Sequence, residues 1–358
     1  MSTILAEKTA ACMFSPLGKC RASVYIHALQ EQSMKSVIRI SALAISLALP
    51  LAASAQQESW PSRPVHILST SPPGGSVDLF ARIVAEECSR SFGQPFVVEN
   101  RPGANGNIGV DLVLRAPADG HMLFVAPAGP FSINSSIMDS MSFNPQADIA
   151  PVAMLGVSPL LLVVHPSVPA KDLKELLGWL RAQRGNVNYA SQAVASTGFL
   201  AMELLKSLTG TQAAHIPYKG SAAAATADLL AGRVSMSFVN TSTTIPHIRS
   251  GKLRAIAVAE LKRIASAPEV PTVAESGVPG FEATSWFGLG ARAGTPREIV
   301  LRLSEAAARG VTRPEVVARL SKIGIEARPM GPEQFAEFVR AESAKWGDII
   351  RRSGAKVN

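Results

Sequence analysis

The sequence predicts an α/β fold in which two lobes surround a ligand cleft. From Trp60 onward, short apolar runs alternate with segments of helical periodicity, which is typical of parallel sheets covered by helices. Turns of a kind that binds small ligands occur in both halves of the chain. The 358 residues, of which 47% are hydrophobic and 17% charged, provide enough apolar surface for two domain cores.

Seven short apolar runs are the expected strands: 65–68, 96–99, 122–125, 160–164, 187–190, 236–239 and 254–258. Several of the intervening helices carry boundary signals. Asp172 and Glu175 form a capping-box pattern, and Thr295 is expected to cap a helix that has Pro296 at its first position. The last helix is expected from about residue 332, with its apolar stripe facing a core.

The stretch 69–82, S-T-S-P-P-G-G-S-V-D-L-F-A-R, is the expected turn between the first strand and the first helix. Pro72 and Pro73 stiffen this turn, while Gly74 and Gly75 can take positive φ and let a ligand approach the backbone. Free N–H groups at a helix start attract a carboxylate or phosphate oxygen. The turn therefore predicts an anion site with these candidate residues: Ser71, Pro73, Gly74, Gly75, Ser76 and Asp78.

Two alternatives stay open for this turn. Asp78 lies in the first helical turn, where it could cap the helix or accept a hydrogen bond from a ligand, and its charge would weaken the attraction for an anion. The other alternative is a purely structural turn that is capped by Ser76.

Two later turns have the same character. Ala128 and Gly129 follow the expected strand 122–125, at the edge where open α/β sheets bind ligands. In the second half of the chain, Ser191, Ser196 and Thr197 supply hydroxyl groups near an expected helix start. Each hydroxyl can equally serve as a cap for its own helix.

Catalytic signatures are missing from the sequence. It has no G-x-S-x-G elbow, Walker A loop, H-E-x-x-H or C-x-x-C pattern, and its histidines are widely spaced. We therefore predict neither an enzyme nor a bound metal or cofactor. No basic cluster interleaved with aromatic residues occurs, so nucleic-acid binding is not expected.

The N-terminus has the pattern of a secretory signal peptide. An apolar run at 40–51 follows Lys35 and Arg39 and precedes Ala-Ser-Ala at 53–55, which predicts cleavage before Gln56 and a mature protein in the periplasm. The predicted signal peptide is 34–55. Residues 1–33 are interpreted as an extension from a start codon assigned too early, with Met34 as the true start. A genuine leader extension beginning at Met1 is the alternative.

The mature part of the chain is mildly basic and has one cysteine. Five of the 35 basic and two of the 27 acidic residues lie in the first 55 positions, which leaves an excess of five basic residues that helps to attract anions. Cys88 is the only cysteine after residue 55, so an intrachain disulfide is excluded there. A monomer is expected by default.

An ordered set of motifs resembles one family, the Bug receptors of tripartite tricarboxylate transporters. The set is P-P-G-G-S-V-D-L-F-A-R (72–82), G-Q-P-F-V-V-E-N-R-P-G-A-N-G-N-I-G (93–109), A-P-A-D-G (116–120), I-P-Y-K-G (216–220), P-H-I-R-S-G-K-L-R-A-I-A-V (246–258), V-P-T-V-A-E-S-G-V-P-G-F (270–281) and S-W-F-G-L (285–289). The resemblance extends from about Trp60 to the C-terminus.

The resemblance implies a type II periplasmic-binding-protein fold whose chain crosses twice between the lobes. Lobe 1 would comprise 60–158 plus 284–358, and lobe 2 would comprise 159–283. It also implies a receptor that captures a small organic carboxylate and delivers it to the membrane components of the transporter. Since such receptors hold carboxylates mostly through backbone N–H groups and water, Lys219 is only a secondary candidate for the site. A sensor that reports to a signalling partner and a periplasmic enzyme are the alternative functions.

Four positions depart from the family pattern and bear on the ligand. Ala193 and Ala195 replace two glycines of the turn in the second half, and Phe199 occupies a histidine position. Val239 stands where relatives often have an aspartate, so an acidic acceptor for a ligand ammonium group is missing. Because an unpaired buried ammonium is costly, we expect a dicarboxylic or aromatic acid without an amino group.

Overall fold

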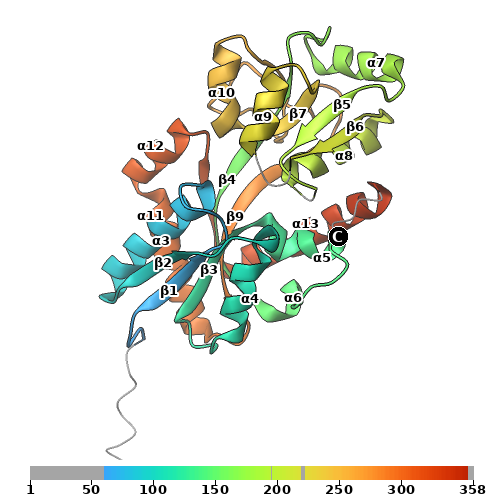
Figure 1. Ribbon diagram of the computed structural model, residues 1–358. Coiled ribbons are helices and arrows are strands. Elements are labelled where there is room, and N and C mark those ends of the chain that lie inside the picture. The colour runs from blue at the N-terminus through green and yellow to red at the C-terminus, as the bar shows by residue number, and fades with distance from the viewer. Residues whose placement is uncertain (1–59, 195, 219–221, 354–358) are drawn as a thin grey trace, which may run out of the picture. The chain divides into compact units, whose positions relative to one another are not determined.

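The computed structural model describes residues 60–194, 196–218 and 222–353, which all belong to one compact unit that begins at Trp60 (Figure 1). The predicted signal peptide 34–55, the extension 1–33, Ala195 and Lys219 lie outside the described residues.

A ten-stranded mixed sheet runs through this part of the chain. Eight strands follow the order β2-β1-β3-β9-β4-β7-β5-β6, and β8 and β10 each pair with β4 outside this path. The strands are β1 Val65–Ser69, β2 Phe96–Asn100, β3 Met122–Pro127, β4 Ile149–Val164, β5 Asn188–Ser191, β6 Ala214–Pro217, β7 Met236–Asn240, β8 Arg254–Val258, β9 Thr284–Arg292 and β10 Glu326–Met330.

The long strand β4 belongs to two groups of strands. Its residues 149–159 pair with β9, its residues 160–164 pair with β7, and its residues 161–164 pair with β8. Figure 1 shows β4 passing from the strands around β1 and β3 to those around β5 and β7. The chain returns through the segment between β8 and β9, where Thr284 pairs with Pro159. The chain thus crosses twice between the groups, and the predicted α/β fold is confirmed.

The prediction of parallel strands holds only at the two ends of the sheet. β1 is parallel to β2 and β3, and β5 is parallel to β6 and β7. The central strands β4 and β9 are antiparallel to their neighbours. Strands β6, β9 and β10 and the first part of β4 were not among the predicted strands.

Strand β9 escaped prediction because it contains two glycines. A Cβ on Gly288 would lie 2.3 Å from the Phe335 ring, and one on Gly290 would lie 2.3 Å from the Phe124 ring. Glycine normally weakens a strand interior, so the pattern argued against a strand. Aromatic side chains from distant elements occupy the space above both glycines, which only the packed structure reveals.

Helices flank the sheet. The longer ones are α3 Ser76–Phe92, α4 Asn107–Arg115, α7 Leu173–Gln183, α8 Thr197–Thr209, α9 Ala222–Leu230, α10 Thr241–Arg249, α11 Arg297–Thr312, α12 Pro314–Lys322 and α13 Pro332–Ser353. Short helical segments occur at η2 Ala104–Gly106, η3 Gly129–Ile133, α5 Asn134–Ile137 and α6 Pro145–Asp148. No described helix is both long and apolar enough to cross a membrane.

The predicted helix boundaries are partly correct. Asp172 caps α7, because its carboxylate accepts a hydrogen bond from the Glu175 N–H at 2.8 Å. The Thr295 cap is wrong, since α11 begins at Arg297 and the Thr295 hydroxyl instead donates to the Arg292 carbonyl. The apolar stripe of α13 is buried as expected, and it includes Trp346.

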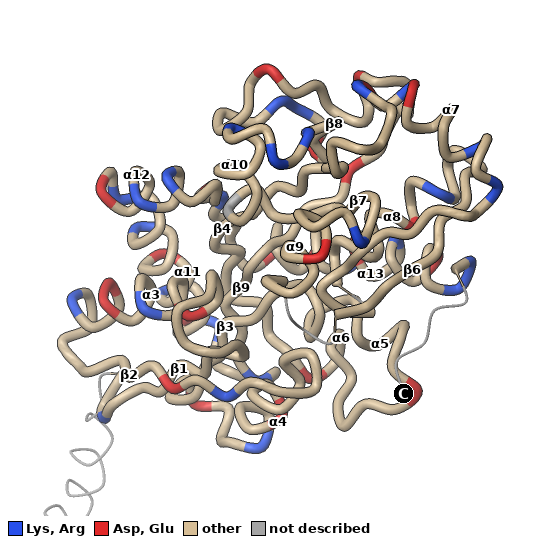
Figure 2. The backbone as a smooth tube through the Cα atoms, turned by 45° about the horizontal axis from the view of Figure 1, so that its top comes forward, with Lys and Arg blue, Asp and Glu red and all other residues tan. Residues whose placement is uncertain are grey.

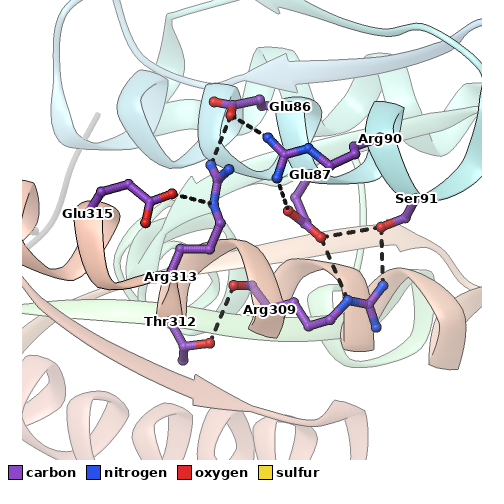
Figure 3. A network of polar contacts seen from close by, with 8 residues as sticks. All are labelled: Glu86, Glu87, Arg90, Ser91, Arg309, Thr312, Arg313 and Glu315. Atoms are coloured by element: carbon purple, nitrogen blue, oxygen red, sulfur yellow. Dashed lines mark hydrogen bonds and ion pairs between the residues drawn. The ribbon is translucent and has the colours of Figure 1, made fainter.

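A network of charges joins α3 to α11 and α12 (Figure 3). Glu87 of α3, whose side chain is only 9% exposed, lies 3.3 Å from Arg90 and 3.6 Å from Arg309. Glu86 pairs with Arg90 and with Arg313, at 3.0 Å in each case. These contacts tie the C-terminal half of α3 to α11 and to the start of α12.

Candidate functional site

A cavity of about 630 Å³ opens where four strands end. Strands β1, β3, β5 and β7 all lead directly into segments that line it. In the first group of strands, the cavity is lined by all of 70–77 except Gly74 and by parts of 102–106 and 127–134. In the second group, it is lined by parts of 192–198, 222–225 and 238–243. The volume falls within the roughly 300–1,000 Å³ that is typical of small-molecule sites. This arrangement agrees with the expected location beyond the carboxyl ends of strands.

The start of α3 presents backbone donors to this cavity. The first intrahelical hydrogen bond is donated by the Leu79 N–H to the Gly75 carbonyl at 2.9 Å. The N–H groups of Ser76 and Val77 precede that bond, so the helix itself offers them no acceptor, and both residues line the cavity. Together with the helix dipole, these donors favour an anion.

The two glycines of this turn differ. Gly74 has a φ of +83°, which favours glycine, whereas Gly75 has a φ of −81° and is the N-cap of α3. The structural alternative of a Ser76 cap is wrong, because Ser76 is the first helical residue and no side chain caps this helix.

Asp78 does not face the cavity. It is 4% exposed, and its carboxylate accepts hydrogen bonds from the Gly74 N–H, from Arg82 and from Asn100. Burial alone would raise the pKa of Asp78, but these donors together hold it below its usual value. Asp78 is therefore engaged by donors of the protein and is not among the lining residues, and its bond to Gly74 fixes the turn from behind.

The start of α8 is a second set of donors. Ser196 caps α8, since its hydroxyl accepts from the Phe199 N–H at 3.3 Å and donates to the Ala193 carbonyl at 2.7 Å. The N–H groups of Thr197 and Gly198 precede the first intrahelical bond, which Leu200 donates to Ser196. Both residues line the cavity. Two helix starts, one from each group of strands, thus supply donors to one cavity.

Ser191 lies below the cavity rather than in it. Its hydroxyl is 2.7 Å from His215 Nε2 and 2.9 Å from the Ala193 carbonyl oxygen, and the residue is 1% exposed. Since the hydroxyl donates to Ala193, His215 is the donor toward Ser191, which is opposite to the role of a general base. Burial lowers the pKa of His215 to about 4, so the ring is neutral at pH 7. The pair is structural.

No charged side chain among the described residues lines the cavity. Figure 2 shows charges of both signs spread over outer elements such as α7 and α12. The lining side chains that can donate hydrogen bonds are Thr70, Ser71, Ser76, Asn105, Asn134, Gln192, Ser196, Thr197, Asn240, Thr243 and Ser285. No group of three or more His, Cys, Asp or Glu suited to a metal occurs in the described segments.

An aromatic wall completes the site. Trp286 and Phe287 of β9 and Phe238 of β7 line the cavity. The indole N–H of Trp286 donates to the buried carboxylate of Glu342 at 3.1 Å, and the same oxygen accepts from the indole of Trp346 at 2.7 Å. Helix α13 therefore fixes the orientation of the tryptophan in the wall.

Most of the predicted residues reach the cavity. Those that line it are Ser71, Pro73, Gly75, Ser76, Ala128, Gly129, Ser196, Thr197 and Val239, and those that do not are Gly74, Asp78 and Ser191. Gln192, Asn240, Thr243 and the segment 102–106 without Ala104 also line the cavity, although they were not among the predicted residues. Asn240 had a usable signal, because it directly follows an expected strand.

Known proteins resemble this chain over most of its length. The family model described as Tripartite tricarboxylate transporter family receptor matches residues 80–355. BugT of Bordetella pertussis is 36% identical over 308 residues, which cover 86% of this chain and 94% of BugT.

Solved structures give the same result. A protein from R. palustris, solved with adipate, is 35% identical and covers 83% of this chain and 100% of its own, with a TM-score of 0.73. MatC from Rhodopseudomonas palustris, solved with bound malate, is 31% identical, and the match covers 81% of this chain and 100% of MatC, with a TM-score of 0.69. The resemblance to the Bug receptors is confirmed.

Proposed function

Because this chain belongs to the tripartite tricarboxylate transporter family of receptors, we propose that it captures a small organic carboxylate in the periplasm for delivery to such a transporter. The observation that carries the proposal is the pairing of two helix starts, at Ser76 and at Thr197, across a cavity that no charged side chain of the described residues lines. Backbone N–H groups and hydroxyls then replace the water around a carboxylate, and no cationic side chain is needed.

The ligand binds between two lobes that close on it. The limits are 60–158 plus 284–358 for lobe 1 and 159–283 for lobe 2. The change of partners within β4 after residue 159 and the pairing of Thr284 with Pro159 support these limits. Closure would bring the start of α8 toward that of α3 and exclude water from the carboxylate.

The ligand is an acid without an amino group. Val239 and Ala193 line the cavity, and no lining residue in the described part of the chain carries a carboxylate that could pair with an ammonium group. Asp78 is engaged by Arg82 and Asn100, so it cannot take this role. The adipate and malate in two related structures are acids of this class.

A thermal-shift screen of small acids on the protein from Gln56 onward tests the function. Adipate, malate, succinate, benzoate and glutamate form the first set, and an acid present at a hundred times its Kd adds about 2.7 kcal/mol of stability. Calorimetry then ranks the hits. Tight binding of glutamate alone would contradict the proposed ligand class. If none of a broad set of acids bound, the proposal of a carboxylate receptor would be contradicted.

Two further assays address chemistry and location. Incubating the protein with a stabilising acid should return the acid unchanged, and a new product would favour an enzyme. Expression of the full chain should give a periplasmic protein whose N-terminal residue is Gln56, as Edman sequencing or mass spectrometry would read. A cytoplasmic protein that retains residues 34–55 would contradict the signal peptide.

A further inference from the structure

A buried carboxylate stands directly behind the donors of the α3 turn. Asp78 follows Val77, whose N–H group is one of the donors that precede the first intrahelical bond of α3. A negative charge at this position repels an anion on the other side of the turn. An anion site of this form needs something that cancels the charge of Asp78.

The contacts of Asp78 show what supplies that compensation. Oδ2 accepts from the Gly74 N–H at 3.0 Å and from Arg82 Nε at 3.1 Å, and Oδ1 accepts from a terminal nitrogen of Arg82 at 3.1 Å. The guanidinium therefore binds both oxygens. Arg82 lies one turn further along α3, its side chain is 56% exposed, and it does not line the cavity.

A third residue ties this pair to the binding turn. Asn100, at the end of β2, donates from its amide nitrogen to Asp78 Oδ1 at 2.9 Å and to the Ser71 carbonyl at 3.0 Å. The Asp78 carboxylate and the Asn100 amide thus hold the turn at both ends, at Ser71 and at Gly74. The same bond withdraws the Gly74 N–H from any ligand, whereas the N–H groups of the lining residues Gly75, Ser76 and Val77 stay available for an anion.

We infer that Asp78 and Arg82 form a charge-neutral positioning pair, in which the carboxylate shapes the anion-binding turn and the guanidinium cancels its repulsion of the bound carboxylate. The inference rests on the proposed function. Arginine suits the task because its planar, permanently charged group binds both carboxylate oxygens at once. Neither side chain touches the ligand, so both act through the turn.

The test compares three variants with adipate as the probe. Arg82→Gln leaves the Asp78 charge uncompensated and should weaken adipate binding by at least about fivefold at low ionic strength. The loss should shrink in about 0.5 M salt, because screening weakens repulsion between separated charges. Asp78→Asn combined with Arg82→Gln removes both charges and keeps an acceptor for Gly74, so affinity should return to within about twofold of the wild type.

Arg90→Gln is the matched control. Arg90 lies on the same helix, has a nearly equal exposure of 57%, and also pairs with acidic residues, yet it is far from the turn at residues 71–75. Its loss should leave adipate binding unchanged. Calorimetry at two salt concentrations measures all four proteins.

The outcomes separate this inference from the proposed function. Wild-type affinity in Arg82→Gln, a loss independent of salt, or a double variant no better than Arg82→Gln would each overturn the neutral pair while leaving the receptor function intact. Failure of the wild-type protein to bind adipate or any other small acid would overturn both.

Discussion

The conformation of Gly74 is the feature of the binding turn that depends most on a single residue. Its φ of +83° strains any side chain, although a Cβ there would meet no atom within 4 Å. Gly74→Ala should cost about 1–2 kcal/mol of stability and weaken ligand binding about threefold to tenfold, because the strained turn shifts the donors at Ser76 and Val77.

Gly210 provides the matched control for that prediction. It has a φ of +65°, a Cβ there would also meet no atom, and it follows the C-terminal end of α8, opposite to the end at the cavity. Gly210→Ala should lose similar stability in urea denaturation but keep its affinity in calorimetry. Equal affinity in both variants would show that the turn at Gly74 does not position the ligand.

The half-buried His215 makes stability depend on pH. Burial lowers the pKa of its ring to about 4 from the usual 6.5, so the unfolded chain binds a proton in a range where the native state does not. Stability should therefore fall as pH decreases from 6.5 to 4. His215→Phe, which keeps a ring against Tyr189 and Phe199, should flatten this part of the profile of urea midpoints. An unchanged slope would contradict this origin.

At the scale of elements, the close approach of α8 to β7 decides how donors reach the cavity. A Cβ on Gly198 would lie 2.4 Å from the Phe238 carbonyl oxygen, which is backbone and cannot move aside easily. Gly198→Ala should therefore push the start of α8 away from β7, destabilise the protein by about 1–3 kcal/mol and weaken binding.

Replacing Gly178 by alanine should have the opposite effect on stability. Gly178 lies inside α7, and a Cβ there would meet nothing within 4 Å. Gly178→Ala should stabilise the protein by about 0.5–1 kcal/mol through helix propensity and leave binding unchanged. Urea denaturation and calorimetry of both variants compare them, and two variants with the same sign would contradict the packing argument.

At the scale of the whole molecule, a buried carboxylate lies where the chain returns between the two groups of strands. Glu260 is 5% exposed, accepts from the Thr284 hydroxyl at 2.6 Å and lies 3.6 Å from Arg328 of β10. Burial raises the pKa of Glu260, although Thr284 and Arg328 oppose the shift and the nearby Glu282 and Glu326 add to it. The folded pKa lies above the unfolded one, so this group favours folding at low pH and loses that contribution as pH rises.

Arg328→Gln should strengthen the dependence of stability on pH that Glu260 causes. The variant leaves the buried carboxylate without its cation, so it should lose about 1 kcal/mol of stability at pH 7 and less at pH 5, where Glu260 binds a proton more readily. Arg63→Gln, which removes an exposed pair with Asp119, should change stability by less than about 0.5 kcal/mol at either pH. A loss in Arg328→Gln that is equal at both pH values would contradict the role of Glu260.

The sequence by itself determined the features that depend on neighbouring residues. The turn between the first strand and the first helix, the Asp172 cap and the alternation of strands and helices all follow from local patterns, because propensity, capping and turn chemistry act over a few residues. The ordered set of motifs likewise identified the family. Only the tertiary structure decided what Asp78, Ser191 and the glycines of β9 do. Asp78 and Ser191 have some partners nearby in sequence, but Asn100, His215 and the rings of Phe124 and Phe335 lie 22 or more positions from the residues that they contact. Packing contacts and hydrogen bonds between residues so far apart form only when the chain folds, so no local pattern could reveal them.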